Sequence, residues 1–125
     1  MHKGSCLCGA VRFDVDGDLR PPDACHCSQC RKHSGHVFAS TDVARAAVSI
    51  HGEDNISWFR SSEKVRRGFC RTCGSSLFWD PIDGERIGIA MGAFDQPTRT
   101  RLAIHVHVSS KGDYYDITDG LPQKQ

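Results

Sequence analysis

Seven cysteines lie in three tight groups, and thiols at such short spacing are suited to hold metal ions. The groups contain two, three and two residues: Cys6 and Cys8; Cys25, Cys27 and Cys30; Cys70 and Cys73. These numbers cannot be divided into two complete four-thiolate sites, so one site can close while the other lacks a ligand. In zinc proteins a closed site is usually structural, and a three-ligand site is usually catalytic.

The first and third groups are suited to one four-cysteine site. Residues i and i+2 of an extended segment point to the same face, so Cys6 and Cys8 can bind one ion. The two-residue gap between Cys70 and Cys73 curls the chain around a metal, and Gly74 permits the sharp turn that follows. The two pairs predict a structural zinc that joins distant parts of the chain, and its binding free energy becomes folding free energy.

The second group is expected to bind zinc and to leave one position open. Cys25, Cys27 and Cys30 supply three ligands, and three thiolates around a divalent cation leave one net negative charge. Zinc in such an electron-rich site is a poor Lewis acid, so a soft thiolate is a more natural fourth ligand than a water that must be activated. The group therefore predicts a catalytic zinc that binds a substrate thiol.

Histidines close to this group leave an alternative open. His33 or His36 could complete a closed site of three cysteines and one histidine, which would be structural. His26 lies between two ligands and is expected to point away from the ion. His33, His36 and Ser34 are also candidates for proton transfer to or from a substrate oxygen.

The composition limits the class of protein. The chain has 125 residues, 38% of them hydrophobic, and a formal net charge of +1. This length predicts a single domain over residues 1–125, and the balanced charge favours neither nucleic acid nor a membrane surface as a partner. No segment approaches the roughly 20 apolar residues of a membrane span, and no signal peptide precedes the first cysteines. We therefore expect a cytoplasmic protein whose thiols stay reduced and free for metals.

Most of the chain has the pattern of short strands separated by turns. Alternating and β-branched residues predict the strands, and Asp83-Gly84 predicts a hairpin turn. The expected strands are 10–16, 37–40, 48–51, 57–59, 64–69, 77–79, 86–91 and 102–108. A short helical turn is expected at 28–33, and the tail at 122–125 is expected to fray. The fold class is therefore mainly β.

Three further sets of residues are assigned ordinary structural roles. His105 and His107 alternate with aliphatic residues, which predicts that both lie on the solvent-facing side of one strand. Arg66, Arg67 and Arg71 are expected on a solvated charged face, although they could attract the carboxylates of a substrate. The aromatic residues around the third cysteine group are expected in the core: Trp58, Phe59, Phe69, Phe78 and Trp79.

Taken together, the three cysteine groups resemble the motifs of a known family. Residues 4–13, 25–35 and 69–77 are similar to the three motifs of the glutathione-dependent formaldehyde-activating enzyme (GFA), or centromere protein V-like, family. Residues 105–111 and 119–122 also fit. The resemblance implies a β-tent fold built from small antiparallel sheets around a structural zinc, in a single GFA-type zinc-binding domain.

The same resemblance implies an activity. It implies two zinc ions per chain, a structural one at Cys6, Cys8, Cys70 and Cys73 and a catalytic one at Cys25, Cys27 and Cys30. The implied reaction is that of S-(hydroxymethyl)glutathione synthase, a carbon–sulfur lyase that reversibly joins formaldehyde and glutathione. The expected partners are therefore a small thiol such as glutathione and an aldehyde.

Two other functions stay open beside this zinc-dependent lyase acting on thiol–aldehyde adducts. A non-catalytic zinc-binding module that contacts protein or nucleic acid would explain the knuckle at Cys70 and the nearby arginines, but the charge is balanced. A redox enzyme of the methionine sulfoxide reductase kind shares the β-tent fold. That chemistry needs a reactive cysteine late in the chain, and none follows Cys73.

Overall fold

Two β-sheets form the framework of the protein, in a computed structural model that describes all 125 residues. The smaller sheet has the strand order β1-β2-β5, and the larger one has the order β10-β3-β4-β9-β8-β7-β6. The strands are β1 (His2–Ser5), β2 (Arg12–Val15), β3 (Asp23–Cys25), β4 (Phe38–Ala44), β5 (Val48–His51), β6 (Ile56–Arg60), β7 (Val65–Cys70), β8 (Ser76–Pro81), β9 (Arg86–Ala90) and β10 (Ile104–Val106).

Helical structure is limited to one α-helix and four short turns. The α-helix is α1 (Ser28–Ser34), and the 3-10 turns are η1 (Arg45–Ala47), η2 (Glu53–Asn55), η3 (Met91–Ala93) and η4 (Val108–Ser110). None of these helices has the length and apolar character that a membrane crossing requires. The expected helical turn at 28–33 is confirmed as α1, and the mainly β class is confirmed as well.

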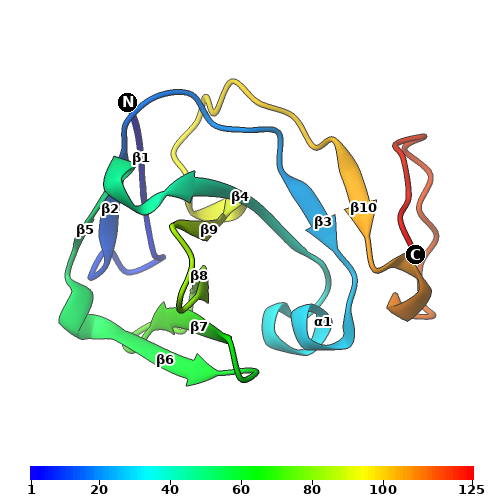
Figure 1. The fold of residues 1–125 in the computed structure, drawn as a ribbon, viewed down its shortest axis with the longest axis horizontal. Coiled ribbons are helices and arrows are strands. Elements are labelled where there is room, and N and C mark those ends of the chain that lie inside the picture. The colour runs from blue at the N-terminus through cyan, green and yellow to red at the C-terminus, as the bar shows by residue number, and fades with distance from the viewer.

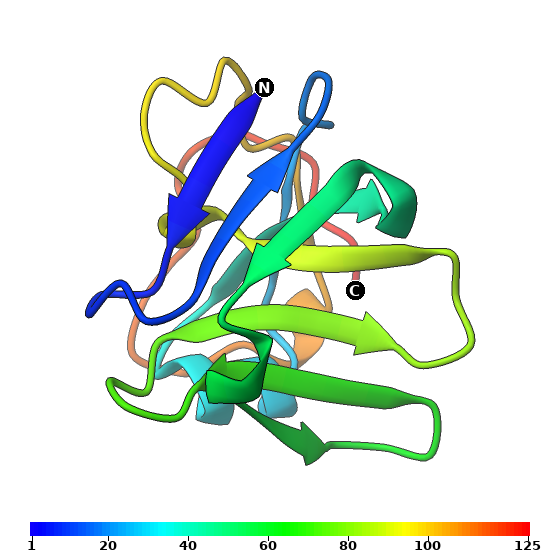
Figure 2. The same cartoon turned by 90° about the vertical axis from the view of Figure 1, so that its left-hand side faces the viewer.

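The larger sheet curves so strongly that strands far apart in its order face each other. Figure 1 shows β3 and β7 on opposite sides of the interior, with α1 close to the end of β3. Figure 2 shows β1, β2 and β5 side by side in front of the larger sheet. This curvature brings α1, which follows β3, against β7, so that Arg67 contacts Cys30. In strand order β4, β9 and β8 lie between β3 and β7.

Most of the expected strands are present, but two further strands and an ordered C-terminal tail were not predicted. The strand expected at 48–51 is confirmed as β5, whereas β1 and β3 were not predicted. All pairings are antiparallel except that β10 runs parallel to β3. The prediction of a frayed tail is wrong, because Lys124 N–H donates to the His105 carbonyl at 2.8 Å and Val108 N–H to the Lys124 carbonyl at 3.0 Å.

The core lies between the two sheets and is centred on aromatic rings. Phe13 from β2 makes edge-on contacts with Phe78 and Phe94, with ring centroids 5.9 and 5.2 Å apart. Edge-to-face packing of this kind adds to the gain from burying the rings. The prediction that all the aromatics near the third cysteine group belong to the core is wrong for Phe59 and Trp79, whose exposed fractions are 58% and 36%.

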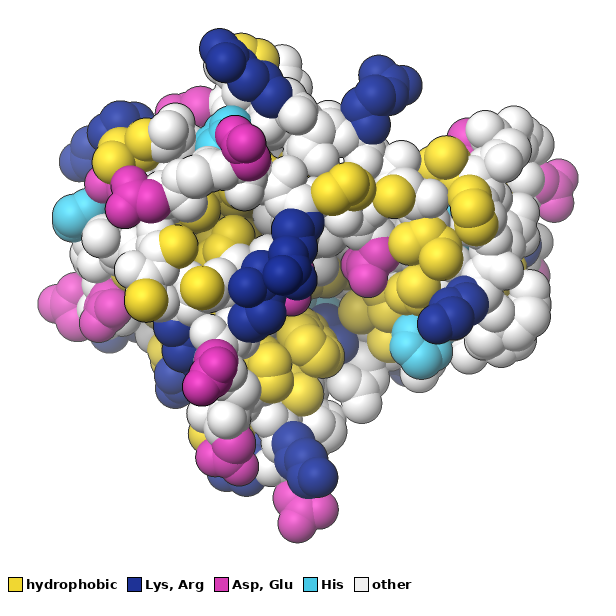
Figure 3. Space-filling model, turned by 45° about the horizontal axis from the view of Figure 1, so that its top comes forward, with side chains coloured by type: hydrophobic (Ala, Val, Ile, Leu, Met, Phe, Trp, Pro, Cys, Tyr) yellow, Lys and Arg dark blue, Asp and Glu magenta, His cyan; other side chains and the backbone are white.

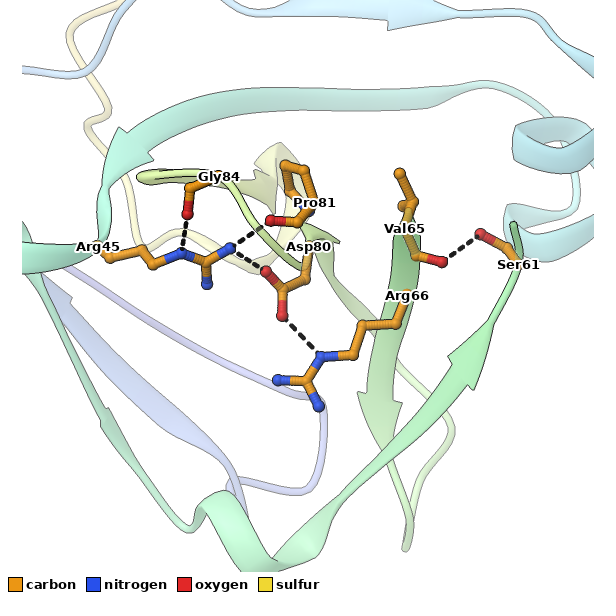
Figure 4. Close-up of polar contacts among 7 residues, drawn as sticks. All are labelled: Arg45, Ser61, Val65, Arg66, Asp80, Pro81 and Gly84. Carbon is orange, nitrogen blue, oxygen red and sulfur yellow. Dashed lines mark hydrogen bonds and ion pairs between the residues drawn. The ribbon is translucent and has the colours of Figure 1, made fainter. Parts of the chain in front are cut away.

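A buried carboxylate ties β8 to its neighbours and sets the direction of the arginines on β7. Asp80 is 2% exposed and pairs with Arg45 and with Arg66, whose Nε lies 2.7 Å from Asp80 Oδ2 (Figure 4). A buried charge needs such partners to offset its desolvation. Since successive residues of a strand point to opposite faces, the direction of Arg66 leaves Arg67 pointing to the other side of the sheet.

Candidate metal centres

The thiols of the first and third cysteine groups meet where the turn after β1 approaches the turn after β7. The sulfur atoms of Cys6, Cys8, Cys70 and Cys73 all lie within 4.8 Å of one another. The Sγ–Sγ distances are 3.7 Å for Cys6 with Cys8 and 3.7 Å for Cys8 with Cys70. Four sulfurs placed tetrahedrally about 2.3 Å from one zinc ion would lie about 3.8 Å apart. The four cysteines therefore fit one tetrahedral ion.

Donor groups surround the sulfurs of this four-cysteine cluster. Val11 N–H donates to Cys6 Sγ at 3.3 Å, and Cys70 Sγ accepts from Cys73 N–H at 3.5 Å and from Asn55 Nδ2 at 3.4 Å. Cys6 and Cys70 are buried. Hydrogen bonds to a thiolate favour its charged form. The cluster is thus a closed set of four ligands prepared to hold a cation, with Cys6 and Cys70 buried and Cys8 exposed.

The second cysteine group gathers at the junction of β3 and α1. Cys25 ends β3, Cys27 is the N-cap residue of α1, and Cys30 lies within the helix. Cys30 N–H donates to Cys27 Sγ at 3.3 Å, which satisfies one of the free amides at the start of a helix. Gly35 ends the helix with φ of 90°, a left-handed conformation that suits glycine. The three sulfurs lie within 4.8 Å of one another and form the three-cysteine cluster.

No histidine joins the three-cysteine cluster. His33 Nδ1 lies 3.4 Å from Ser76 Oγ, and His36 Nδ1 lies 2.6 Å from the Tyr114 hydroxyl. The group of ligand atoms that the fold assembles consists of Cys25, Cys27 and Cys30 alone. The closed site with His33 or His36 as a fourth ligand, which the sequence allowed, is therefore not formed in this structure.

The expectation of one exposed arginine face is wrong. Arg67 is 4% exposed and directs its Nη1 and Nη2 to Cys30 Sγ, at 3.6 and 3.5 Å. Arg66 pairs with Asp80, and Arg71 is exposed beside Asn55. The three arginines therefore do not form one basic patch. Together the hydrogen bond with Cys25 and the Arg67 guanidinium lower the pKa of Cys30 to about 5.

A chain of hydrogen bonds that sequence reasoning missed ties the three-cysteine cluster to the C-terminal segment. His26 is 2% exposed; its Nδ1 meets the Tyr115 hydroxyl, and its Nε2 lies 2.9 Å from His105 Nδ1. His105 Nε2 in turn lies 2.7 Å from Asp119 Oδ2. His26 N–H also donates to the Val106 carbonyl at 3.0 Å. The residue between Cys25 and Cys27 is thus held from both its backbone and its side chain.

The prediction that both histidines near the end of the chain face solvent is wrong for His105, whereas His107 is exposed. His105 is 6% exposed and lies within the hydrogen-bonded chain. After Val106 the backbone leaves the strand, and His107 adopts φ of 54° and ψ of 40°. This left-handed conformation is uncommon for residues other than glycine and, where it persists, is often associated with a function. It places His107 on the wall of a cavity.

A cavity of about 520 Å³ opens beside the three-cysteine cluster. Cys25, Cys27 and Cys30 line it, as do Arg67 and His107. Hydrophobic side chains in a hollow of the surface, with charged side chains beside them, are visible in Figure 3. The cavity walls also include Asp23, Phe38, Asp42, Val65, Trp79 and Val106. The three-cysteine cluster is therefore accessible to a ligand.

Comparisons with known proteins agree with this arrangement. Residues 1–110 match the model of the family described as glutathione-dependent formaldehyde-activating enzyme. A Halomonas elongata protein provisionally named a glutathione-dependent formaldehyde-activating enzyme is 30% identical, over 94% of this chain and 81% of its own length. A Schizosaccharomyces pombe protein described as an uncharacterized lyase is 24% identical, over 94% of this chain and 86% of its own.

The fold also has a solved counterpart. A crystal structure of a Rhodobacter sphaeroides protein superposes with a TM-score of 0.62, covering 98% of this chain and 99% of that one. The two sequences are 19% identical, so this likeness concerns the fold alone.

Proposed function

Because the chain belongs to the glutathione-dependent formaldehyde-activating enzyme family, we propose that it is a zinc-dependent carbon–sulfur lyase acting on thiol–aldehyde adducts, like S-(hydroxymethyl)glutathione synthase. One observation carries the proposal: three cysteine sulfurs converge on the wall of an open cavity, while four others form a closed cluster elsewhere. That division corresponds to one catalytic and one structural zinc. The clustered thiols and the family also support a reducing, cytoplasmic location.

The proposed reaction is the reversible addition of a thiol to an aldehyde. In synthesis the sulfur forms a bond to the carbonyl carbon, the C=O electron pair moves to oxygen, and the proton lost from the thiol ends on that oxygen. Lysis reverses each transfer. Cys25, Cys27 and Cys30 would hold a zinc ion that, when bound, favours the thiolate form of the substrate, because metals lower the pKa of coordinating thiols.

His107 is the residue that we assign to proton transfer. It lies on the cavity wall with the three-cysteine cluster, whereas His33, His36 and Ser34, the candidates from sequence, do not line that cavity. An imidazole can both accept and return the hydroxyl proton of the adduct. The left-handed backbone at His107, which costs free energy in a residue with a Cβ, is the local feature that supports this role.

The cavity has room for a thiol of the size of glutathione. Its volume of about 520 Å³ falls within the range usual for small-molecule sites. Arg67 lies against Cys30, while the carboxyl groups of Asp23 and Asp42 line other parts of the wall. Burial and the nearby Asp42 raise the pKa of Asp23. The carboxyl groups of Asp23 and Asp42 on this wall could thus contact the ammonium group of such a peptide.

An exchange experiment tests the proposed function. With zinc-loaded protein, exchange of carbon-13 formaldehyde into S-hydroxymethylglutathione is followed by NMR, and we expect it to be faster than the uncatalysed exchange. Cys27→Ser should abolish the acceleration while the fold, measured by circular dichroism, is retained. Full activity of Cys27→Ser, or no acceleration by the wild type with glutathione and a panel of small thiols, would overturn the proposal.

A further inference from the structure

Arg67 is a buried cation with no acidic partner. It is 4% exposed, and none of the ion pairs in the structure includes it. Its neighbour Arg66 has the opposite environment: it pairs with Asp80 and its guanidinium lies 3.8 Å from the ring centroid of Trp58. A guanidinium removed from water is costly unless negative charge lies close to it.

The negative charge nearest to Arg67 comes from the three-cysteine cluster. Nη1 and Nη2 lie 3.6 and 3.5 Å from Cys30 Sγ, and Nη2 also lies 3.5 Å from Gln29 Oε1. The remaining nitrogen, Nε, is buried without a hydrogen-bond partner. Both terminal nitrogens of the guanidinium therefore contact a single sulfur, and its third nitrogen has no acceptor.

The charge count at the cluster changes when Arg67 is included. Three thiolates and a divalent zinc leave one negative charge, and Arg67 brings the sum to zero. An anionic fourth ligand then gives a net charge of −1, whereas without Arg67 the net charge would be −2. Coulomb energies between groups this close and this poorly solvated are large enough to decide which ligand binds.

We propose that Arg67 is a positioning residue that offsets the charge of the three-cysteine cluster and thereby selects a thiolate, over a neutral donor, as its fourth ligand. This inference rests on the proposed function, since it assumes a metal ion at the cluster. It goes further by assigning ligand selection to a residue outside the cysteine motifs. The selectivity comes from a fixed positive charge, so a neutral side chain of similar shape should lose it.

Ligand titration of the cobalt-substituted protein tests this inference. The visible absorption of cobalt changes when a fourth ligand binds, and the difference spectrum isolates the open cluster because a closed four-cysteine site takes no further ligand. The probes are 2-mercaptoethanol, which binds as an anion, and imidazole, which binds as a neutral donor. In Arg67→Gln the Kd for 2-mercaptoethanol should rise by at least about tenfold, whereas the Kd for imidazole should change less than about threefold.

Arg66→Gln is the matched control, since it removes the adjacent arginine from the opposite face of the same strand. It should leave the difference in Kd between the two probes as in the wild type. An equal loss for both ligands in Arg67→Gln would show a merely structural role and overturn the inference, as would no loss at all. If Arg67→Gln does not fold, Arg67→Lys carries the test: it keeps the charge and should keep the preference for the thiolate, and a lost preference overturns the inference.

Failure of the proposed function would look different. A wild-type protein that binds 2-mercaptoethanol in an Arg67-dependent way but never accelerates adduct exchange would refute the lyase and leave the ligand selection standing. Conversely, normal exchange activity together with equal thiolate binding by wild type and Arg67→Gln would refute only the role of Arg67.

Discussion

The two cysteine clusters use the same side chain in opposite surroundings. The four-cysteine cluster joins two turns, buries Cys6 and Cys70, and directs backbone and Asn55 donors at its sulfurs. The three-cysteine cluster lies on a cavity wall and has a buried guanidinium against one sulfur. The first offers a metal ion four sulfurs, and the second offers three. The contrast indicates that a cluster's role depends on what surrounds the thiols, because the thiols themselves are alike.

Position in the chain adds to the contrast. The four-cysteine cluster connects residues about sixty positions apart, and a cross-link over such a distance stabilises the fold when metal binds. The three-cysteine cluster spans residues 25–30 and closes no long loop. Loss of metal from the first should therefore affect the whole molecule, and loss from the second should affect mainly the cavity.

The largest effect should separate the clusters by stability. Cys70→Ser removes a fully buried ligand of the four-cysteine cluster, and structural zinc contributes about 10 kcal/mol or more in small domains, as much as the whole stability of many. We expect this variant to lose its cooperative unfolding transition in calorimetry. Cys27→Ser serves as the comparison and should keep a transition within a few degrees of the wild type. Equal behaviour of the two variants would contradict the division of roles.

Gradual removal of metal should separate the clusters by exchange rate. A chelator reaches the three-cysteine cluster through the cavity, whereas the other cluster is closed by its fourth ligand. We expect one equivalent of zinc to leave first, with loss of turnover, while the circular dichroism spectrum stays unchanged. Zinc content, activity and ellipticity are measured on the same samples. Simultaneous loss of both ions would argue that the clusters do not differ in accessibility.

A substitution at His107 should affect the chemistry of the cavity without affecting either cluster. Asparagine tolerates the left-handed conformation of this residue, so His107→Asn should keep the backbone and remove the imidazole ring. We expect turnover to fall by about a hundredfold, the usual contribution of a general acid or base, with both zinc ions retained. His36→Asn, which changes an exposed histidine outside the cavity, is the control. Full turnover in His107→Asn would remove His107 from the mechanism.

Features encoded in local spacing could be predicted from the sequence. The pairing of Cys6 and Cys8 with Cys70 and Cys73 follows from motif spacing, and the fold brings these sulfurs together. The strand at 48–51 and the helical turn after Cys27 also follow from local pattern and capping. For the strand and the helical turn the deciding interactions lie within a few residues, where sequence patterns are most informative. The distant cysteine pairs could be matched because each pair has a metal-binding spacing of its own.

Features that depend on distant partners could not be predicted. Arg67 is indistinguishable from Arg66 in the sequence, and only the register of β7 against Asp80 decides which of them is buried. Similarly, His105 has a pattern typical of a solvent-facing position, but His26 and Asp119 reach it from opposite ends of the chain. Such partners are set by tertiary packing, which overrides the local alternation.

The smallest effect should come from the hydrogen-bonded chain of Tyr115, His26, His105 and Asp119. This chain adjoins the three-cysteine cluster through His26, which lies between Cys25 and Cys27. Asp119→Asn removes the charged acceptor at His105, so that His105 and then His26 lose their fixed orientation beside Cys25 and Cys27. Loss of such supporting partners weakens metal binding by about tenfold in other metal sites. We expect a competing chelator dye to show a decrease of this size for the first zinc ion removed and none for the second. An equal decrease for both ions would show that Asp119 supports the fold generally.

The pH dependence of this effect follows from the carboxyl group itself. The hydrogen bond with His105 lowers the pKa of Asp119 below its ordinary value near 3.9. A carboxylate with a lowered pKa contributes its full effect above that ordinary value and loses it as the pH falls through the lowered one. The difference between wild type and Asp119→Asn should therefore be the same at pH 6.5 and pH 8. A difference that grows between these two values would mean that another group, rather than the Asp119 carboxylate, controls the orientation of His26.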